Sequence, residues 1–295
     1  MKNTLIIIFL ICATAIHAVA QAIGNPPFRS YLPEEVHETS GLFFHNGKVW
    51  THNDSGGKPI LYALDTSTFE IVQRITLINA KNKDWEDVCT DGETVFVGDM
   101  GNNKGSRDNL RIFTFPLSAI PQEGDAEITV DTIKFRFGDQ TDFEKRKQGT
   151  DFDCETIFAT EKYLYLFSKN WVTETTRLYR LNKTGRNQVA EVVTWFNPEG
   201  LVTGADYNKE KNVLALVGYR NKIWEPFLYL ITDFDEENYK AKGIRIRLPN
   251  HIGCQTEGIC FYDDLKCFIS AETSPTFSTR VFTVDFEKWI DRTRP

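Results

Sequence analysis

The amino-acid sequence predicts an all-β fold, a single five-bladed β-propeller, and three observations lead to this prediction. A short unit recurs along the 295 residues and is most complete in KDWEDVCTDGETVFVGDMGNN at residues 83–103. Successive copies begin roughly 45–55 residues apart, about the length of a four-stranded blade, except across one longer interval. The last copy lacks a fourth strand, which a segment near the N-terminus can supply, closing the ring. A six-bladed ring is the alternative.

The most complete copy contains two predicted strands joined by a tight turn. Residues 85–90 and 94–97 are apolar or alternating runs, and Asp91-Gly92 between them favours a β-hairpin. Glu86 opens the first strand, and the Asp/Asn/Gly cluster at 99–103 ends the second. Antiparallel pairing places both at the same end of the hairpin, so we expect a ligand site there.

An oxygen-bearing side chain occupies the same position in all five copies. The copies begin ETSGLFF, DWEDVCT, DCETIFA, VTGADY and QTEGICF. Aligned on their first apolar strand positions, they share a column formed by Ser40, Glu86, Glu155, Thr203 and Glu257. Because the first strand of each propeller blade lines the central channel, these side chains should form a ring near one mouth.

Apolar runs and turn signals place the strands of each blade. The first two blades are predicted at residues 41–44, 49–52, 60–64 and 71–77, and at 85–90, 94–97, 110–115 and 128–137. The next two are predicted at 156–159, 163–168, 177–181 and 189–195, and at 204–207, 213–217, 227–231 and 243–248. The fifth has residues 258–262, 266–271 and 279–286, and residues 28–32 would complete it. Residues 138–151 form an insertion that should emerge at the ligand-binding mouth.

Composition indicates one folded domain, residues 21–295. Hydrophobic residues make up 41% of the chain and aromatic residues 13%, which is enough for a packed core. The formal net charge is −7 and the chain has no Lys/Arg block, so a nucleic-acid polymer is not expected as a partner. We expect a monomer.

Residues 1–20 have the pattern of a signal peptide. A positively charged start precedes an apolar run over residues 5–15, and Ala18-Val19-Ala20 forms a small-x-small cleavage site before Gln21. The mature protein is therefore expected to be secreted or periplasmic. A lipid anchor on Cys12 is the alternative to a soluble form. No later run approaches the roughly 18 apolar residues of a membrane span.

Five cysteines follow the predicted leader, and an odd number cannot all pair internally. Cys260 and Cys267 would lie opposite each other if Asp263-Asp264 forms a two-residue turn, so a disulfide is possible there. The alternative is that all of them are small buried thiols. No Cys/His spacing suggests a zinc site.

Three members of the aligned column are carboxylates. Like charges brought together in a narrow channel repel and raise at least one pKa, unless a cation neutralises them. The column offers only oxygen ligands, which indicates a hard ion, and a loose ring of hydroxyls, carboxylates and water suits Ca²⁺ better than octahedral Mg²⁺. We therefore predict a calcium site formed by Ser40, Glu86, Glu155, Thr203 and Glu257. The alternative is that these polar groups only solvate the channel.

The ends of the second strands should surround the same mouth, one layer further out. Asp54 and Asp99 are the candidate catalytic residues, either of which can serve as base for a metal-bound water. The candidate ligand-binding residues are Asn53, Asn102, Lys169, Arg220 and Glu272. Lysine and arginine there suit a phosphate or carboxylate, because arginine offers a bidentate fork and lysine a point charge. Ordinary turn chemistry is the alternative for each Asn/Asp/Gly cluster.

Two families resemble these motifs. The segments ETSGLFFHNGKVWTHNDSGG, KDWEDVCTDGETVFVGDMGNN and DFDCETIFATEKYLYLFSKN resemble an uncharacterised family of secreted bacterial propeller proteins with HNDSG, WED and GDxGxN motifs. That resemblance implies a fold and a compartment. More distantly, the column is similar to the Ser, Glu, Glu, Ser, Glu ring of the calcium-activated nucleotidases, the apyrase family of five-bladed propellers. By position, four members match in type and Thr203 replaces the second serine. This resemblance implies calcium-assisted hydrolysis of a nucleoside diphosphate.

The first functional hypothesis is therefore a calcium-dependent hydrolase that acts on a small anionic, phosphate-bearing substrate. The alternative is a non-catalytic propeller that binds a glycan or a protein and in which calcium is structural. The fold alone does not decide between them.

Overall fold

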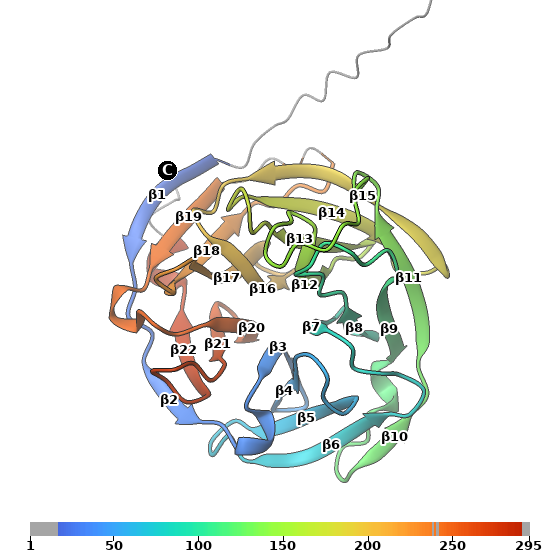
Figure 1. Cartoon of the computed structure of the whole chain (residues 1–295). Coiled ribbons are helices and arrows are strands. Elements are labelled where there is room, and N and C mark those ends of the chain that lie inside the picture. Colours follow the sequence, from blue (N-terminus) through green and yellow to red (C-terminus); the bar gives the residue numbers. More distant parts are fainter. Residues whose placement is uncertain (1–16, 238, 240–241, 291–295) are drawn as a thin grey trace, which may run out of the picture.

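The computed structural model describes residues 17–237, 239 and 242–290, and these residues are almost entirely β-structure. They form twenty-two strands, three short 3₁₀ helices and one four-residue α-helix, α1 (Glu287–Ile290). The strands lie in twisted sheets arranged around a central axis (Figure 1). The predicted all-β propeller is confirmed.

Antiparallel pairing groups most strands into five four-stranded units, which we number in chain order. Unit 1 contains β3 (Thr39–His45), β4 (Lys48–Asn53), β5 (Ile60–Asp65) and β6 (Ile71–Leu77). Unit 2 contains β7 (Trp85–Thr90), β8 (Thr94–Asp99), β9 (Leu110–Pro116) and β11 (Asp131–Phe137). Unit 3 contains β12 (Asp153–Ala159), β13 (Tyr163–Lys169), β14 (Thr176–Asn182) and β15 (Asn187–Phe196).

Units 4 and 5 complete the ring. Unit 4 contains β16 (Leu201–Asn208), β17 (Val213–Arg220), β18 (Glu225–Thr232) and β19 (Lys242–Arg247). Unit 5 contains β20 (Thr256–Asp263), β21 (Lys266–Ala271), β22 (Arg280–Asp285) and β2 (Phe28–Tyr31). The first strand of each unit faces the axis, so β3, β7, β12, β16 and β20 surround the centre (Figure 1).

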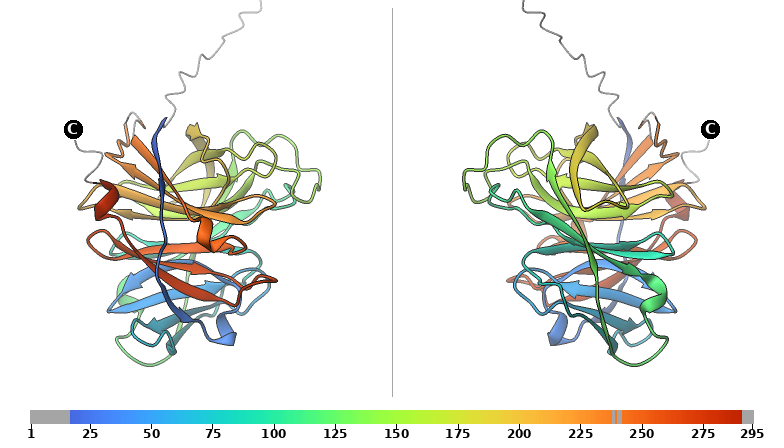
Figure 2. Two further views of the ribbon diagram at one scale, coloured as in Figure 1. Left: turned by 90° about the vertical axis from the view of Figure 1, so that its left-hand side faces the viewer. Right: turned by 90° about the vertical axis from the view of Figure 1, so that its right-hand side faces the viewer.

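The N-terminal strand β2 closes the ring, as the sequence predicts. It pairs antiparallel with β22 and supplies the fourth strand of unit 5. The preceding strand β1 (His17–Ile23) runs along the outside of the ring toward unit 5 (Figure 2) and pairs parallel with β19 of unit 4. The first and the last strand of the described chain, β1 and β22, therefore lie in neighbouring units.

Parallel pairs at the periphery were not predicted from the sequence. Strand β10 (Ala126–Ile128) adds to β6, β1 adds to β19, and β11 of unit 2 pairs with β15 of unit 3. Each of these pairs covers an outer strand that would otherwise present unpaired N–H and C=O groups.

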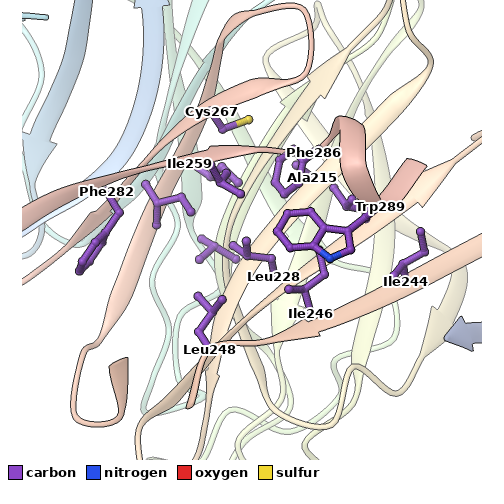
Figure 3. Close-up of a cluster of buried hydrophobic side chains, with 14 of the residues drawn as sticks. Ala215, Leu228, Ile244, Ile246, Leu248, Ile259, Cys267, Phe282, Phe286 and Trp289 are labelled. Atoms are coloured by element: carbon purple, nitrogen blue, oxygen red, sulfur yellow. The ribbon is translucent and has the colours of Figure 1, made fainter. Parts of the chain in front are cut away.

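Hydrophobic side chains fill the spaces between adjacent units. Inner and middle strands are buried on both faces, as in β18, whereas the outer strand β15 alternates between buried and exposed residues. Figure 3 shows the cluster between units 4 and 5, where Trp289 of α1 packs with Ile246 and Phe286. This packing fixes the inner strands around the axis.

The cysteine pattern follows the buried-thiol alternative. All five described cysteines are free and buried. Cys260 pairs with Phe268 and Phe261 with Cys267, and an irregularity follows between Phe261 and Asp263. The two thiols are thus one register position apart, so the cross-strand disulfide that a two-residue turn would allow does not form.

The predicted leader lies mostly outside the described residues. Residues 17–20 are in strand β1, so the predicted cleavage point before Gln21 falls within that strand. The described helices are all too short to cross a membrane.

Candidate functional site

A small polar cavity lies at the ends of the inner strands, close to the axis. Its volume is about 160 Å³. All five units contribute to its lining, which includes five carboxylates and one ammonium group: Thr39, Ser40, Asp54, Glu86, Asn103, Glu155, Lys169, Trp171, Tyr219, Gln255, Glu257 and Glu272.

The three glutamates of the aligned column come together in this cavity. Glu86, Glu155 and Glu257 lie near the start of β7, β12 and β20 and are 5%, 6% and 7% exposed. Since they occupy equivalent positions in three units, the ring symmetry brings their carboxyl groups to the same end of the channel.

The two hydroxyl members of the column hold neighbouring units together. The Ser40 hydroxyl donates to the carbonyl oxygen of Glu86 in unit 2. The Thr203 hydroxyl donates to the carbonyl oxygen of Thr256 in unit 5, at 2.6 Å. Ser40 also lines the cavity, whereas Thr203 is not one of its lining residues.

Two aspartates that the sequence analysis missed lie beside Glu86. Oxygen atoms of Asp54, Asp84 and Glu86 lie within 4.8 Å of one another, and so do those of Glu86, Asp153 and Glu155. Asp84 and Asp153 each precede a column glutamate by two residues, as the D-x-E pattern in DWED and DCET shows. Because alternate strand residues share a face, this spacing could have revealed them.

Lys169 provides the ammonium group among the lining residues. Its Nζ atom lies 3.1 Å from Glu155 Oε2, and 4.9 Å and 5.4 Å from the ring centres of Trp171 and Tyr219. Although burial opposes it, the charge of Glu155 raises the pKa of Lys169 well above its usual value. The nearby carboxylate thus favours the charged form of this lysine.

Burial and mutual repulsion raise the pKa of the cavity carboxyls. Burial, then the charges of Asp84 and Glu272, raise the pKa of Asp54 to about 8. Burial raises the pKa of Glu155 to about 8 despite Lys169, and it raises the pKa of Glu86 well above its usual value, helped by Asp54. Among the described residues, Glu86 and Glu155 each have an oxygen within 4.8 Å of the other, so the two carboxyl groups are close neighbours.

Glu257 and Glu272 line the unit 5 side of the cavity. Burial raises the pKa of both, with Lys169 opposing. Glu272 accepts a hydrogen bond from Gln255 at 2.6 Å. Within the described chain, the Glu257 carboxylate accepts no hydrogen bond.

The structure holds the other candidate residues away from the cavity. Asp99 is fully buried and pairs with Arg107, its Oδ1 lying 2.9 Å from Nη2. Arg220 is half exposed and lies 3.7 Å from Glu225. Asn53 and Asn102 hydrogen-bond to backbone groups, as the turn-chemistry alternative describes. These side chains support the loops around the cavity.

The loop after β8 packs directly against the carboxylates. A Cβ atom on Gly101 would lie 1.9 Å from Glu86 Oε1 and 2.6 Å from Asp84 Oδ2, so a larger residue there would displace these carboxyl groups. Arg107 donates to the carbonyl oxygens of Gly101, at 2.6 Å, and Asp99, at 3.0 Å. The guanidinium group therefore fixes the path of this loop.

The insertion connects two walls of the cavity. The backbone N–H of Gln148 donates to the carbonyl oxygen of Asn103 at 2.7 Å, and the N–H of Trp171 donates to that of Thr150 at 3.1 Å. Asn103 and Trp171 both line the cavity. The insertion thus positions lining residues of units 2 and 3.

Two further acids, the buried Asp87 and the half-buried Asp206, join the inner strands. Asp87 accepts hydrogen bonds from the N–H groups of Val88 and Ile157, at 2.8 Å and 2.9 Å, and a further one from Ala205. Asp206 accepts from Tyr207 at 2.9 Å and from Phe261 at 2.8 Å. These carboxylates bridge units 2, 3, 4 and 5 through backbone donors.

The cavity carboxylates fit a hard divalent cation. The buried Asp54 Oδ1 atom has no hydrogen-bond partner among the described residues. Ligand oxygens about 2.3–2.6 Å from Ca²⁺ can be up to about 5 Å apart, which accommodates the separations within both groups around Glu86. The donor set contains no sulfur or imidazole, so calcium or magnesium fits better than zinc.

Comparisons with known proteins support the fold. No family model and no curated protein matches this chain. The structure is similar to the PQQ-bound form of aldose sugar dehydrogenase from Streptomyces coelicolor, with 9% identity, coverage of 88% of this chain and 99% of that chain, and a TM-score of 0.51. It is also similar to hydrazine synthase from Kuenenia stuttgartiensis, with 11% identity, 90% and 82% coverage and a TM-score of 0.48. At such low identity, the first likeness shows the fold alone.

Proposed function

We propose that the protein binds a calcium ion in its central cavity and uses it to hold a small anionic, phosphate-bearing ligand, whose hydrolysis is the reaction. The imbalance of charge carries this proposal. Five carboxylates line the cavity, Asp54, Glu86, Glu155, Glu257 and Glu272, and Lys169 is the one cationic group in the lining among the residues that the structure describes. Without a cation, repulsion would leave several of these groups protonated at neutral pH.

The arrangement of Lys169 supports an anionic ligand. When bound, calcium supplies the positive charge that attracts and orients phosphate oxygens and a water molecule. Lys169 offers a second positive charge, held in place by Glu155 and two aromatic rings. An anion between these two centres would be contacted on both sides.

A carboxylate without hydrogen-bond donors would accept the proton from the attacking water. Among the described residues, Asp54 Oδ1 is buried without a partner and the Glu257 carboxylate accepts no hydrogen bond; burial raises the pKa of each, which makes it a stronger base. Export, which we propose from the leader, would place the site where extracellular calcium is available.

A structural role for calcium is the second candidate. The carboxylates around the cavity come from units 1, 2, 3 and 5, so a cation among them would brace the ring. The mouth would then bind a glycan or a partner protein without turnover.

The test is hydrolysis of nucleoside diphosphates and simple phosphate esters by the full chain, with calcium and with chelator. Calcium-dependent phosphate release that disappears in Glu155→Gln supports the enzyme. Calcium binding without turnover on these esters supports the structural role, and absence of calcium binding rejects both.

A further inference from the structure

The carboxylates around Glu86 form two groups that differ in their hydrogen-bond partners. One group contains Asp54, Asp84 and Glu86, and the other contains Glu86, Asp153 and Glu155. Glu86 belongs to both, so the partners of the other four residues decide which group needs a cation.

The group on the unit 3 side already has donors. Asp153 Oδ1 accepts hydrogen bonds from the N–H groups of Asn102, at 2.5 Å, and Cys154, at 3.2 Å. Its Oδ2 atom accepts from Trp171 Nε1 at 2.7 Å. Glu155 pairs with Lys169 at 3.1 Å. Protein groups therefore compensate both carboxylates.

The group between units 1 and 2 lacks such donors. Asp54 Oδ1 is buried without a partner. The Asp84 carboxylate accepts no hydrogen bond from the described residues, and its nearest cation, Arg107, is 3.9 Å away and already bonded to Asp99. Glu86 is 5% exposed, its carboxyl group accepts no hydrogen bond from the described residues, and the charges that surround it are those of other carboxyl groups. Among the described residues, the 3.9 Å contact with Arg107 is thus the one ion pair that these three carboxylates make.

The backbone of the loop after β8 packs closely against these acids. Gly101 packs against both Asp84 and Glu86, where any side chain would collide with the carboxylate oxygens. Arg107 donates a hydrogen bond to the Gly101 carbonyl oxygen at 2.6 Å and so holds the glycine in this position. Among the described residues, the loop donates no hydrogen bond to either carboxylate.

We propose that the calcium ion binds off the axis, between units 1 and 2, with Asp54, Asp84 and Glu86 as its protein ligands and water completing the shell. Lys169 is then a tethered cation that takes the place of a second ion on the unit 3 side. This inference rests on the proposed calcium binding and changes the ligand set predicted from the aligned column. It makes Asp54 a ligand and leaves Glu257 as the base.

Calcium titration calorimetry on the chelator-treated full chain tests this assignment. Asp54→Asn and Asp84→Asn remove ligands, Glu257→Gln removes a member of the axial ring, and Glu272→Gln removes one cavity charge as the matched control. We expect the two aspartate variants to weaken calcium affinity about tenfold or more beyond the control, because loss of a ligand adds to loss of charge. Glu257→Gln should resemble the control.

The opposite pattern would overturn the assignment. If Glu257→Gln weakens calcium affinity about tenfold or more while both aspartate variants match the control, the ion lies on the axis. Absence of calcium binding by the wild-type chain rejects the proposed function itself.

Thermal unfolding in chelator confirms that each variant is folded. In chelator we expect Asp54→Asn and Asp84→Asn to raise Tm, because each removes a repelling charge. Added calcium should then raise the Tm of these variants less than it raises the Tm of the wild type. A lowered Tm in chelator for both, with a full calcium shift, also contradicts the assignment.

Discussion

Glu86 and Asp87 are adjacent in sequence and both buried, yet they have opposite surroundings. Asp87 accepts three backbone N–H groups from units 2, 3 and 4. Glu86 lies beside further carboxyl groups, and among the described residues no backbone N–H donates to its carboxylate. Burial raises the pKa of both, but hydrogen bonds oppose that rise only at Asp87. Asp87 is thus a structural acid with backbone hydrogen-bond donors, whereas Glu86 lacks such donors and is a candidate ligand for a cation.

The largest effect is expected from removing the satisfied acid. Asp87→Ala leaves three buried N–H groups without an acceptor, which should lower the free energy of unfolding by about 3–5 kcal/mol. Denaturant unfolding with and without calcium measures this. If calcium restored the lost free energy of unfolding, Asp87 would belong to the cation site and would not differ from Glu86.

Replacing the unsatisfied acid should have the opposite sign. Glu86→Gln removes a repelling charge, so we expect Tm in chelator to rise by a few degrees, with about 1 kcal/mol of added stability. The same variant should lose most of the calcium-induced increase in Tm. Wild-type behaviour in both conditions would show that Glu86 is not at the cation site.

Stability of the chelated protein should fall as pH rises from about 4 to about 8. Asp54 and Glu155 have folded-state pKa values of about 8, above those of an unfolded chain, so the folded state binds more protons in this range. Ionising them without a cation costs stability, and calcium should flatten the dependence. Chemical unfolding at several pH values checks the sign. Stability that rises over this range in chelator would contradict it.

Lys169→Met should tighten calcium binding several-fold. The substitution removes a positive charge 3.1 Å from Glu155, so the cavity becomes more negative. It should also weaken binding of an anion. Lys209→Met is the control, because Lys209 pairs with Glu161 at an exposed position outside the cavity. Weaker calcium binding in Lys169→Met would indicate that the ammonium group orders the site.

The smallest effect is expected at Arg220. It is half exposed and pairs loosely with Glu225, so Arg220→Ala should change the free energy of unfolding by less than about 0.5 kcal/mol and leave calcium affinity unchanged. A clear loss of ligand binding in Arg220→Ala would instead indicate that Arg220 contacts the ligand.

The repeat made the glutamate ring predictable, because equivalent positions in a ring-shaped fold converge. The same alignment, extended by two residues, contains Asp84 and Asp153. It could not reveal how each acid is satisfied, since that depends on loops between the strands. Asp99 illustrates this: its partner Arg107 lies in a loop whose path the sequence does not define.

The outer strands were harder to predict for a similar reason. The parallel pairing of β10 with β6 and of β1 with β19 joins segments distant in sequence, and no turn signal marks such a pair. The sequence predicts Arg220 at the mouth because it ends β17. In the structure its side chain lies 3.7 Å from Glu225 on the next strand. A strand end locates the backbone and leaves the side-chain direction open.

The most direct test of the cation site is calorimetric titration of the chelator-treated wild-type chain with calcium near neutral pH. If the cavity binds calcium as proposed, we expect a saturable heat with one ion bound per chain and a matching rise in Tm. A titration without saturable heat, together with an unchanged Tm, would show that the cavity balances its carboxylates by protonation alone.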